Sequence, residues 1–310
     1  MSGLLPVNPS LIAIEPKSIG AYEDAVRAGG GVPTKLAPNV GALIWTSYHH
    51  PHELQQVLQA NPQLQWVQLP WAGVDAFAET LSHPVRFTSA KGSYREPVAE
   101  HALMLCMALG RKLPERVKAK SWGEKFAVSL YDANVVVVGA GGITEELLNQ
   151  LAPFRAKVTV VRNQNAPMVG AHRTVSLDQL DQVLPEAQFV ILACALTPKT
   201  LGLFNANRLA LMNRDAYLVN VARGPVVVTS DLLAALDNGL IAGAALDVTD
   251  PEPLPDGHLA WSTPNLIITP HTADTPPQVQ HFFSQRIEAN VRAYLGNGKW
   301  IGVVDPNLGY

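Results

Sequence analysis

The chain has 310 residues, a length that suits two domains better than one. Hydrophobic residues make up 47% of it and charged residues 16%, so a large core is expected and extended disorder is excluded. The formal net charge of −3 argues against a nucleic-acid-binding surface. The longest apolar run, residues 102–109, is too short to span a bilayer, and the first ten residues do not resemble a signal peptide.

The two cysteines, Cys106 and Cys194, each lie in an apolar stretch, which favours core packing over a disulfide. A reducing compartment is therefore expected, and we predict a cytoplasmic protein with no membrane or nucleic-acid partner and no bound metal.

The first part of the chain alternates predicted strands with predicted helices. Strands are expected at residues 11–14, 42–46, 64–69 and 85–89, and helices at 18–28 and 51–59. This alternation indicates a parallel α/β unit, in which ligands bind beyond the carboxyl ends of the strands. Trp45 and the turn at Ala72 and Gly73 lie at such ends. Backbone N–H groups of the turn could hold a carboxylate, or the turn could be a plain connection.

A polar link at residues 90–97 leads into a helix at 98–109 that is apolar on nearly every side. Such a helix is expected to be buried between domains or subunits. Glu100 and His101 on this helix could be catalytic, but a satisfied pair between domains is favoured.

The second part of the chain is organised around residues 134–144, where four valines precede the glycine turn GAGG and a predicted helix. A buried strand, a glycine turn and a helix are the setting of a dinucleotide-binding motif. Gly139 permits the turn, and Gly141 lets the backbone approach a pyrophosphate at the helix N-terminus. Thr144 stands in place of the third glycine of the motif. Because that glycine serves close packing of the helix against the strand, its loss weakens the motif without removing the phosphate site. A bare turn in a buried sheet is the alternative.

Arg162 stands 18 residues past Thr144, near the position where an acidic residue would bind the ribose 2′-hydroxyl of NAD. An arginine can instead pair with the 2′-phosphate of NADP. We therefore predict a preference for NADP over NAD, with a solvated surface arginine as the alternative.

The remaining elements continue the strand–helix alternation. Ser230 is expected to cap one of these helices, with Gly239 beyond its end, and the last helix is expected to return to the first domain. Strands are predicted at residues 157–161, 188–194, 216–221, 242–248 and 266–269, and helices at 177–184, 205–212, 231–237 and 277–295.

Polar residues follow three of these strands, and all are expected at the sheet edge that carries the glycine turn. Arg223 could hold the carboxylate of a 2-oxo acid and polarise its carbonyl. His271 could give a proton to the developing alkoxide, and Glu252 could favour its protonated form and fix its orientation. Asp247 is expected against the nicotinamide ring. Each residue alone could have an ordinary structural role, but together they indicate hydride transfer.

These residues also carry a family resemblance. The stretches LVNVARGPVVVTSDLLAAL from Leu218, AGAALDVTDPEPLP from Ala242 and NLIITPH from Asn265 resemble the D-isomer-specific 2-hydroxyacid dehydrogenases, with Arg, Glu and His in the same order. EPVAEHAL from Glu96 and LTPKT from Leu196 are similar too. The looser amino-terminal part, with its AGVD turn, resembles the glyoxylate/hydroxypyruvate reductase branch.

The resemblance implies that Arg223 clamps the substrate, that His271 donates and accepts the proton, and that Glu252 is its partner. It also implies two domains with the active site in the cleft, and a homodimer built on the glycine-rich domain. Residues Trp45, Ala72, Gly73 and Arg223 are expected to meet the substrate. The cofactor site is expected to include Gly139, Gly141, Gly142, Ile143, Arg162, Asn163, Cys194, Leu196, Val221, Ala222 and Asp247.

We therefore expect an α/β protein in which a doubly wound, Rossmann-type domain, residues 93–275, is inserted in a smaller flavodoxin-like substrate domain, residues 1–92 and 276–310. The predicted function is reduction of a small 2-oxo acid, such as glyoxylate or hydroxypyruvate, by NADPH. Two alternatives remain: the same dehydrogenase using NAD, and a dinucleotide-sensing binding protein with little catalytic activity.

Overall fold

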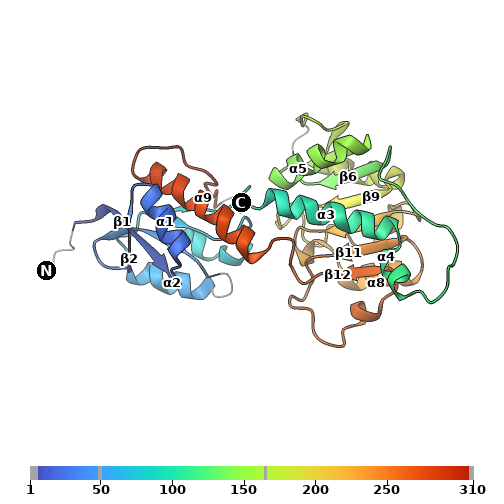
Figure 1. The fold of residues 1–310 in the computed structure, drawn as a ribbon, viewed down its shortest axis with the longest axis horizontal. Coiled ribbons are helices and arrows are strands. Elements are labelled where there is room, and N and C mark those ends of the chain that lie inside the picture. Colours follow the sequence, from blue (N-terminus) through green and yellow to red (C-terminus); the bar gives the residue numbers. More distant parts are fainter. Residues whose placement is uncertain (1–5, 48–50, 164–165, 307–310) are drawn as a thin grey trace. The chain divides into compact units, whose positions relative to one another are not determined.

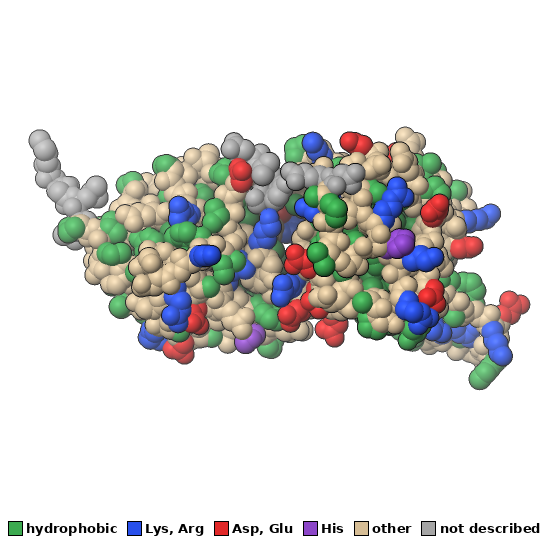
Figure 2. Space-filling view, turned by 90° about the horizontal axis from the view of Figure 1, so that it is seen from above, with side chains coloured by type: hydrophobic (Ala, Val, Ile, Leu, Met, Phe, Trp, Pro, Cys, Tyr) green, Lys and Arg blue, Asp and Glu red, His purple; other side chains and the backbone are tan. Residues whose placement is uncertain are grey.

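The computed structural model describes residues 6–47, 51–163 and 166–306. The chain divides into two compact units, shown in Figure 1. Unit 1 comprises Met1–Tyr94 and Thr275–Tyr310, and unit 2 comprises Arg95–Asp274. Lys and Arg side chains are interspersed with Asp and Glu on the faces seen in Figure 2. No helix in the described part of the chain is long and apolar enough to cross a membrane.

Unit 1 is built on a five-stranded parallel sheet with the order β2-β1-β3-β4-β5, which is the flavodoxin-like order. Helices α1 and α9 contact each other, and α2 adds Leu54 and Leu58 to a separate core cluster. The elements are β1 (Asn8–Glu15), α1 (Gly20–Ala28), β2 (Val32–Thr34), β3 (Val40–Trp45), α2 (Pro51–Ala60), β4 (Trp66–Gln68), β5 (Arg86–Thr88) and α9 (Pro276–Tyr294).

Unit 2 holds a seven-stranded parallel sheet with the order β12-β11-β10-β9-β6-β7-β8. When β6 is counted as the first strand, this is the Rossmann order with one further strand, β12, at the edge. The strand order reverses between β6 and β9. The strands are β6 (Asn134–Val138), β7 (Lys157–Arg162), β8 (Arg173–Ser176), β9 (Phe189–Leu192), β10 (Tyr217–Asn220), β11 (Gly243–Leu246) and β12 (Leu266–Ile268). The α-helices are α3 (Arg95–Gly110), α4 (Leu113–Lys118), α5 (Gly142–Leu151), α6 (Leu180–Val183), α7 (Ala206–Leu211) and α8 (Thr229–Asp237). The predicted fold class is confirmed.

The valines of β6 alternate between two cores, because successive side chains of a strand point to opposite faces. Val136 and Val138 pack in the core that α6, α7 and α8 cover. Val135 and Val137 pack in the core under α3 and α5. Burial on both faces explains why this strand is an unbroken apolar run.

Several local predictions were wrong. The helix expected at 177–184 is three short segments, 3₁₀ turns at Leu177–Gln179 and Leu184–Glu186 flanking α6, and Pro185 lies in the first turn of the last. Ser230 does not cap α8, which begins one residue earlier, at Thr229. The short strands β2 and β8 and helix α4 were not predicted. The other 3₁₀ turns are Asp75–Phe77, Thr80–Ser82, Ala152–Phe154, Gly224–Val226 and Leu259–Ser262.

Helix α3 is buried on one side only. Ala102, Leu105 and Cys106 pack in the core, whereas Met104 and Met107 are 40% and 42% exposed. Burial raises the pKa of the Cys106 thiol to about 12, so this residue is an inert core side chain, as expected.

Candidate active site

The candidate residues of unit 2 follow the carboxyl ends of its parallel strands. They therefore lie at one edge of the sheet, as predicted, on both sides of the point where the strand order reverses. Gly139 follows β6, Arg162 ends β7, Cys194 follows β9, Val221 follows β10, Asp247 follows β11 and His271 follows β12.

The glycine turn has the properties of an anion site. Gly139 has φ of +119°, and a Cβ there would collide with the backbone of Ala193 and Cys194. A Cβ at Gly141 would meet nothing within 4 Å. Gly141 is the N-cap of α5 and no side chain caps that helix, so its first-turn N–H groups can meet a phosphate. Gly142 and Ile143 form this first turn.

Thr144 fits the place of the third glycine. Its side chain is fully buried, and its hydroxyl Oγ1 donates a hydrogen bond of 3.0 Å to the Gly139 carbonyl. The threonine therefore packs closely and fixes the turn from within.

Other candidates follow β9 and β10, the next two strands along the sheet from β6. Cys194 is partly buried, and burial raises the pKa of its thiol to about 11. Leu196 packs against the core, and Val221 and Ala222 are buried.

Arg162 is partly buried, and its guanidinium donates one long hydrogen bond, 3.4 Å, to the Ala166 carbonyl. Within the described ranges, no carboxylate lies within ion-pair distance of it. The adjacent Asn163 is exposed.

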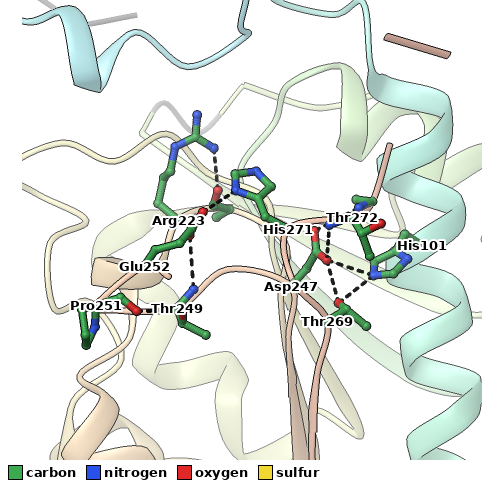
Figure 3. Close-up of polar contacts among 11 residues, drawn as sticks. His101, Arg223, Asp247, Thr249, Pro251, Glu252, Thr269, His271 and Thr272 are labelled. Carbon is green, nitrogen blue, oxygen red and sulfur yellow. Dashed lines mark hydrogen bonds and ion pairs between the residues drawn. The ribbon is translucent and has the colours of Figure 1, made fainter. Parts of the chain in front are cut away.

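His271 and Glu252 form a close pair (Figure 3), with 2.6 Å between His271 Nδ1 and Glu252 Oε1. The two side chains are 28% and 40% exposed. Burial would raise the pKa of the Glu252 carboxyl, but the hydrogen bond and charge of His271, with smaller effects from Thr249 and Arg223, lower it below its ordinary value. Glu252 is therefore the charged partner that His271 was expected to have.

Arg223 lies beside this pair (Figure 3). Its backbone is held by the buried Asn220, which donates to the Arg223 carbonyl at 3.0 Å and accepts from the Ala222 amide at 3.0 Å. A Cβ on the next residue, Gly224, would collide with the Thr249 carbonyl, so glycine lets this loop touch the one that carries Glu252. Sequence reasoning missed Asn220, although a lone amide closing the apolar strand YLVN was a signal for it.

Asp247 is 2% exposed and accepts hydrogen bonds from within unit 2. Its Oδ1 receives the Thr269 hydroxyl at 2.6 Å and the Thr272 amide at 3.0 Å, and its Oδ2 receives the Ala273 amide at 3.3 Å. His101 Nε2 lies 3.2 Å from Oδ1. His101 therefore pairs within its own unit, not across domains as expected, and Glu100 is exposed.

The candidate residues of unit 1 lie at the ends of β3 and β4. Trp45 is 2% exposed and belongs to the core, which favours packing as its main role. Ala72 and Gly73 are partly buried, and among the described residues their amides donate no hydrogen bond. Tyr94 anchors this turn by donating from its hydroxyl to the Pro70 carbonyl at 2.8 Å.

No group of three or more His, Cys, Asp or Glu residues that could hold a metal ion occurs in the described part of the chain.

Comparison with known proteins identifies the family. Residues 102–273 match the model for the D-isomer specific 2-hydroxyacid dehydrogenase, NAD binding domain. This chain belongs to the D-isomer specific 2-hydroxyacid dehydrogenase family. It is thus an NAD(P)-dependent oxidoreductase that transfers a hydride between NAD(P)H and a 2-oxo acid, and its cofactor is NADP or NAD.

Individual relatives agree with this assignment. An uncharacterized protein in the proB 3′ region of Corynebacterium melassecola is 38% identical over 80% of this chain and 84% of that protein. The glyoxylate reductase/hydroxypyruvate reductase of Mus musculus is 30% identical over 76% of this chain and 75% of its own. A D-isomer specific 2-hydroxyacid dehydrogenase from Xanthobacter autotrophicus, solved with NADPH and MES, matches 97% of this chain and 99% of its own, with a TM-score of 0.83 and 27% identity.

Proposed function

We propose that this family member is a reductase of a small 2-oxo acid, glyoxylate or hydroxypyruvate, with NADPH as its preferred cofactor. The observation that carries the proposal is the 2.6 Å contact between His271 and Glu252 beside Arg223, at the sheet edge that also carries the glycine turn. The mouse relative named for these two substrates supports their choice.

The residues around the glycine turn fit a dinucleotide, since the open space at Gly141 and the uncapped start of α5 suit a pyrophosphate. When bound, the reduced nicotinamide supplies the hydride. The residues that would hold the cofactor are Gly139, Gly141, Gly142, Ile143, Arg162, Asn163, Cys194, Leu196, Val221, Ala222 and Asp247. Unit 2 is accordingly proposed as the nucleotide domain and unit 1 as the substrate domain.

The proposed roles of the polar trio follow from their chemistry. Arg223 binds the substrate carboxylate and polarises the adjacent carbonyl, because a guanidinium offers two parallel N–H donors. His271 gives a proton to the developing alkoxide from Nε2, since Nδ1 faces Glu252. Glu252 holds the imidazole in this orientation and balances its positive charge.

Unit 1 is proposed to contribute contacts to the substrate. The amides of Ala72 and Gly73 are suited to a carboxylate, since successive N–H groups in a turn form an anion-binding concavity. Trp45, at the end of β3, is the third proposed substrate residue of unit 1.

The cofactor preference rests on Arg162. Its guanidinium lies at the end of β7, makes one long hydrogen bond, and has no carboxylate partner among the residues described. A 2′-phosphate would supply the missing anion. The NADPH held by the Xanthobacter structure is consistent with this choice.

We also propose a cytoplasmic homodimer. Figure 1 shows α3, α4 and the segment 119–133 that connects α4 to β6. Several large apolar side chains of these elements are exposed, and a second copy of the chain would cover them. They are Met104, Met107, Leu113, Val117, Trp122 and Phe126, and Trp122 is 91% exposed. Sedimentation of the wild type and of Trp122→Glu tests the dimer. The wild type should sediment as a dimer, and the carboxylate introduced by Trp122→Glu should weaken the association.

The function is tested by measuring NADPH and NADH oxidation with a panel of 2-oxo acids. We expect turnover of glyoxylate or hydroxypyruvate with a higher kcat/KM for NADPH. Turnover with a higher kcat/KM for NADH would leave the reaction standing and refute the cofactor preference. Tight cofactor binding without turnover of any acid would refute the reductase and favour a dinucleotide sensor.

A further inference from the structure

The loop that carries His271 has an unusual backbone. His271 has φ of +48°, a left-handed conformation that residues other than glycine adopt rarely and at a cost in free energy. Such a conformation persists only where neighbouring groups hold it. The direction of the His271 imidazole therefore depends on what fixes this loop.

Asp247 supplies most of the fixing contacts. Its backbone carbonyl accepts the His271 amide at 2.8 Å, and its carboxylate accepts the amides of the two following residues, Thr272 and Ala273. The Thr269 hydroxyl donates to Oδ1 from the other end of the loop. One carboxylate thus ties together both sides of His271.

His101 completes the shell around this carboxylate. The only hydroxyl proton of Thr269 goes to Asp247 Oδ1, so Thr269 Oγ1 can only accept from His101 Nε2, 3.0 Å away. Asp247 Oδ1, 3.2 Å from the same nitrogen, is also an acceptor. Although burial would raise the pKa of Asp247, hydrogen bonds from His101, Thr269 and Thr272 and the charge of His101 lower it, so the carboxylate is ionised. Nε2 of His101 must therefore carry a hydrogen.

We infer that His101 is a positioning residue for catalysis. By donating from Nε2 to Thr269 and Asp247, it joins α3 to the loop that holds the His271 imidazole against Glu252 (Figure 3). His101 itself needs only to donate a hydrogen bond and transfers no proton. The inference rests on the proposed role of His271 as proton donor.

Side-chain replacements separate this role from simple packing. Gln can place an amide N–H near the position of His101 Nε2, whereas Leu offers no donor and Asn is too short. We expect His101→Leu and His101→Asn to lower kcat about tenfold, the usual worth of a lost hydrogen bond, and His101→Gln to stay within about threefold. The KM for the 2-oxo acid and the dissociation constant of NADPH should change less than kcat. Glu100→Gln, at the exposed neighbouring position, is the control.

A double-mutant cycle tests the route through Asp247. In an Asp247→Asn background the same His101→Leu change should cost less, about threefold or less, because a neutral amide oxygen accepts a weaker hydrogen bond from His101 than the carboxylate does. Equal losses for Gln, Asn and Leu, an undiminished loss in the Asp247→Asn background, or an unchanged kcat for His101→Leu would each overturn the inference. If His101→Leu does not fold, comparing kcat of His101→Asn with kcat of His101→Gln shows whether a hydrogen-bond donor at this position is needed. A wild type without turnover would instead refute the proposed function.

Discussion

Unit 2 contains two carboxylate–histidine pairs that differ in burial. Glu252 and His271 are 40% and 28% exposed, whereas Asp247 and His101 are 2% and 12% exposed. In our proposal the first pair exchanges a proton with the substrate. The second pair is enclosed by hydrogen-bond partners from the loop that carries His271, namely Thr269, Thr272 and Ala273. If the proposed roles hold, the difference in burial decides what a carboxylate–histidine pair does: the more exposed pair transfers a proton, and the enclosed pair positions a loop.

Among the changes around the two pairs, a large effect is expected when the exposed pair loses its neighbouring cation, Arg223. Arg223→Gln removes the charge that would hold the substrate carboxylate and polarise the carbonyl, so kcat/KM should fall roughly 10²–10³-fold. The buried pair should keep its contacts, and the midpoint of thermal unfolding should hardly change. Steady-state kinetics and a melting curve check this, and a fully active variant would contradict the role of Arg223.

A change away from both pairs should alter cofactor choice alone. Arg162→Ala removes a charge-assisted hydrogen bond, so the KM for NADPH should rise by roughly 10–150-fold, the equivalent of about 1.5–3 kcal/mol. The KM for NADH should stay within about twofold, because NADH has no 2′-phosphate. Lys199→Ala, in an exposed turn, is the matched control. Equal changes with both cofactors would show that Arg162 does not contact the phosphate.

Replacing the two carboxylates should separate the two pairs by stability. Asp247→Asn replaces a buried acceptor of several hydrogen bonds with an amide and should lower the free energy of unfolding by about 1–3 kcal/mol. Glu252→Gln, at a half-exposed position, should cost less than about 1 kcal/mol while still lowering kcat. Urea unfolding measures both. Equal losses of stability would erase the distinction between the pairs.

The smallest effect is on the pH dependence of stability. The folded-state pKa of Asp247 and of Glu252 lies below the ordinary values of 3.8 and 4.5, so each stabilises the fold above those values and loses that contribution as the pH falls through its folded pKa. Asp274 acts in the opposite sense, because burial raises its pKa. Asp247→Asn should therefore reduce the slope of the free energy of unfolding against pH at acidic pH, by the equivalent of about one bound proton at most. Asp274→Asn should not reduce this slope.

Much of the site could be predicted because parallel strands bring their carboxyl ends to one edge. That rule alone brought Arg223, Asp247 and His271 together, and the fold class followed from the strand–helix alternation. The role of Thr144 could not be predicted, because only its packed geometry shows its hydroxyl on the Gly139 carbonyl.

The partner of His101 was also beyond reach from sequence. The interpretation of α3 as a helix that is apolar all round favoured a contact between domains, whereas the contact to Asp247 depends on how far α3 rotates about its axis over the sheet. The Glu252–His271 pair, by contrast, was predicted from its chemistry at the strand ends and from the family pattern in which its residues lie.

The central claim is that His271 transfers a proton and His101 only donates a hydrogen bond. It is tested most directly by making the same substitution, His→Gln, at both positions and comparing kcat for reduction of the 2-oxo acid. Gln donates a hydrogen bond but cannot supply the proton, so His271→Gln should lose about 10²–10⁴-fold and His101→Gln about threefold or less, with NADPH bound normally by both. Equal losses at the two positions, or an active His271→Gln, would contradict the account.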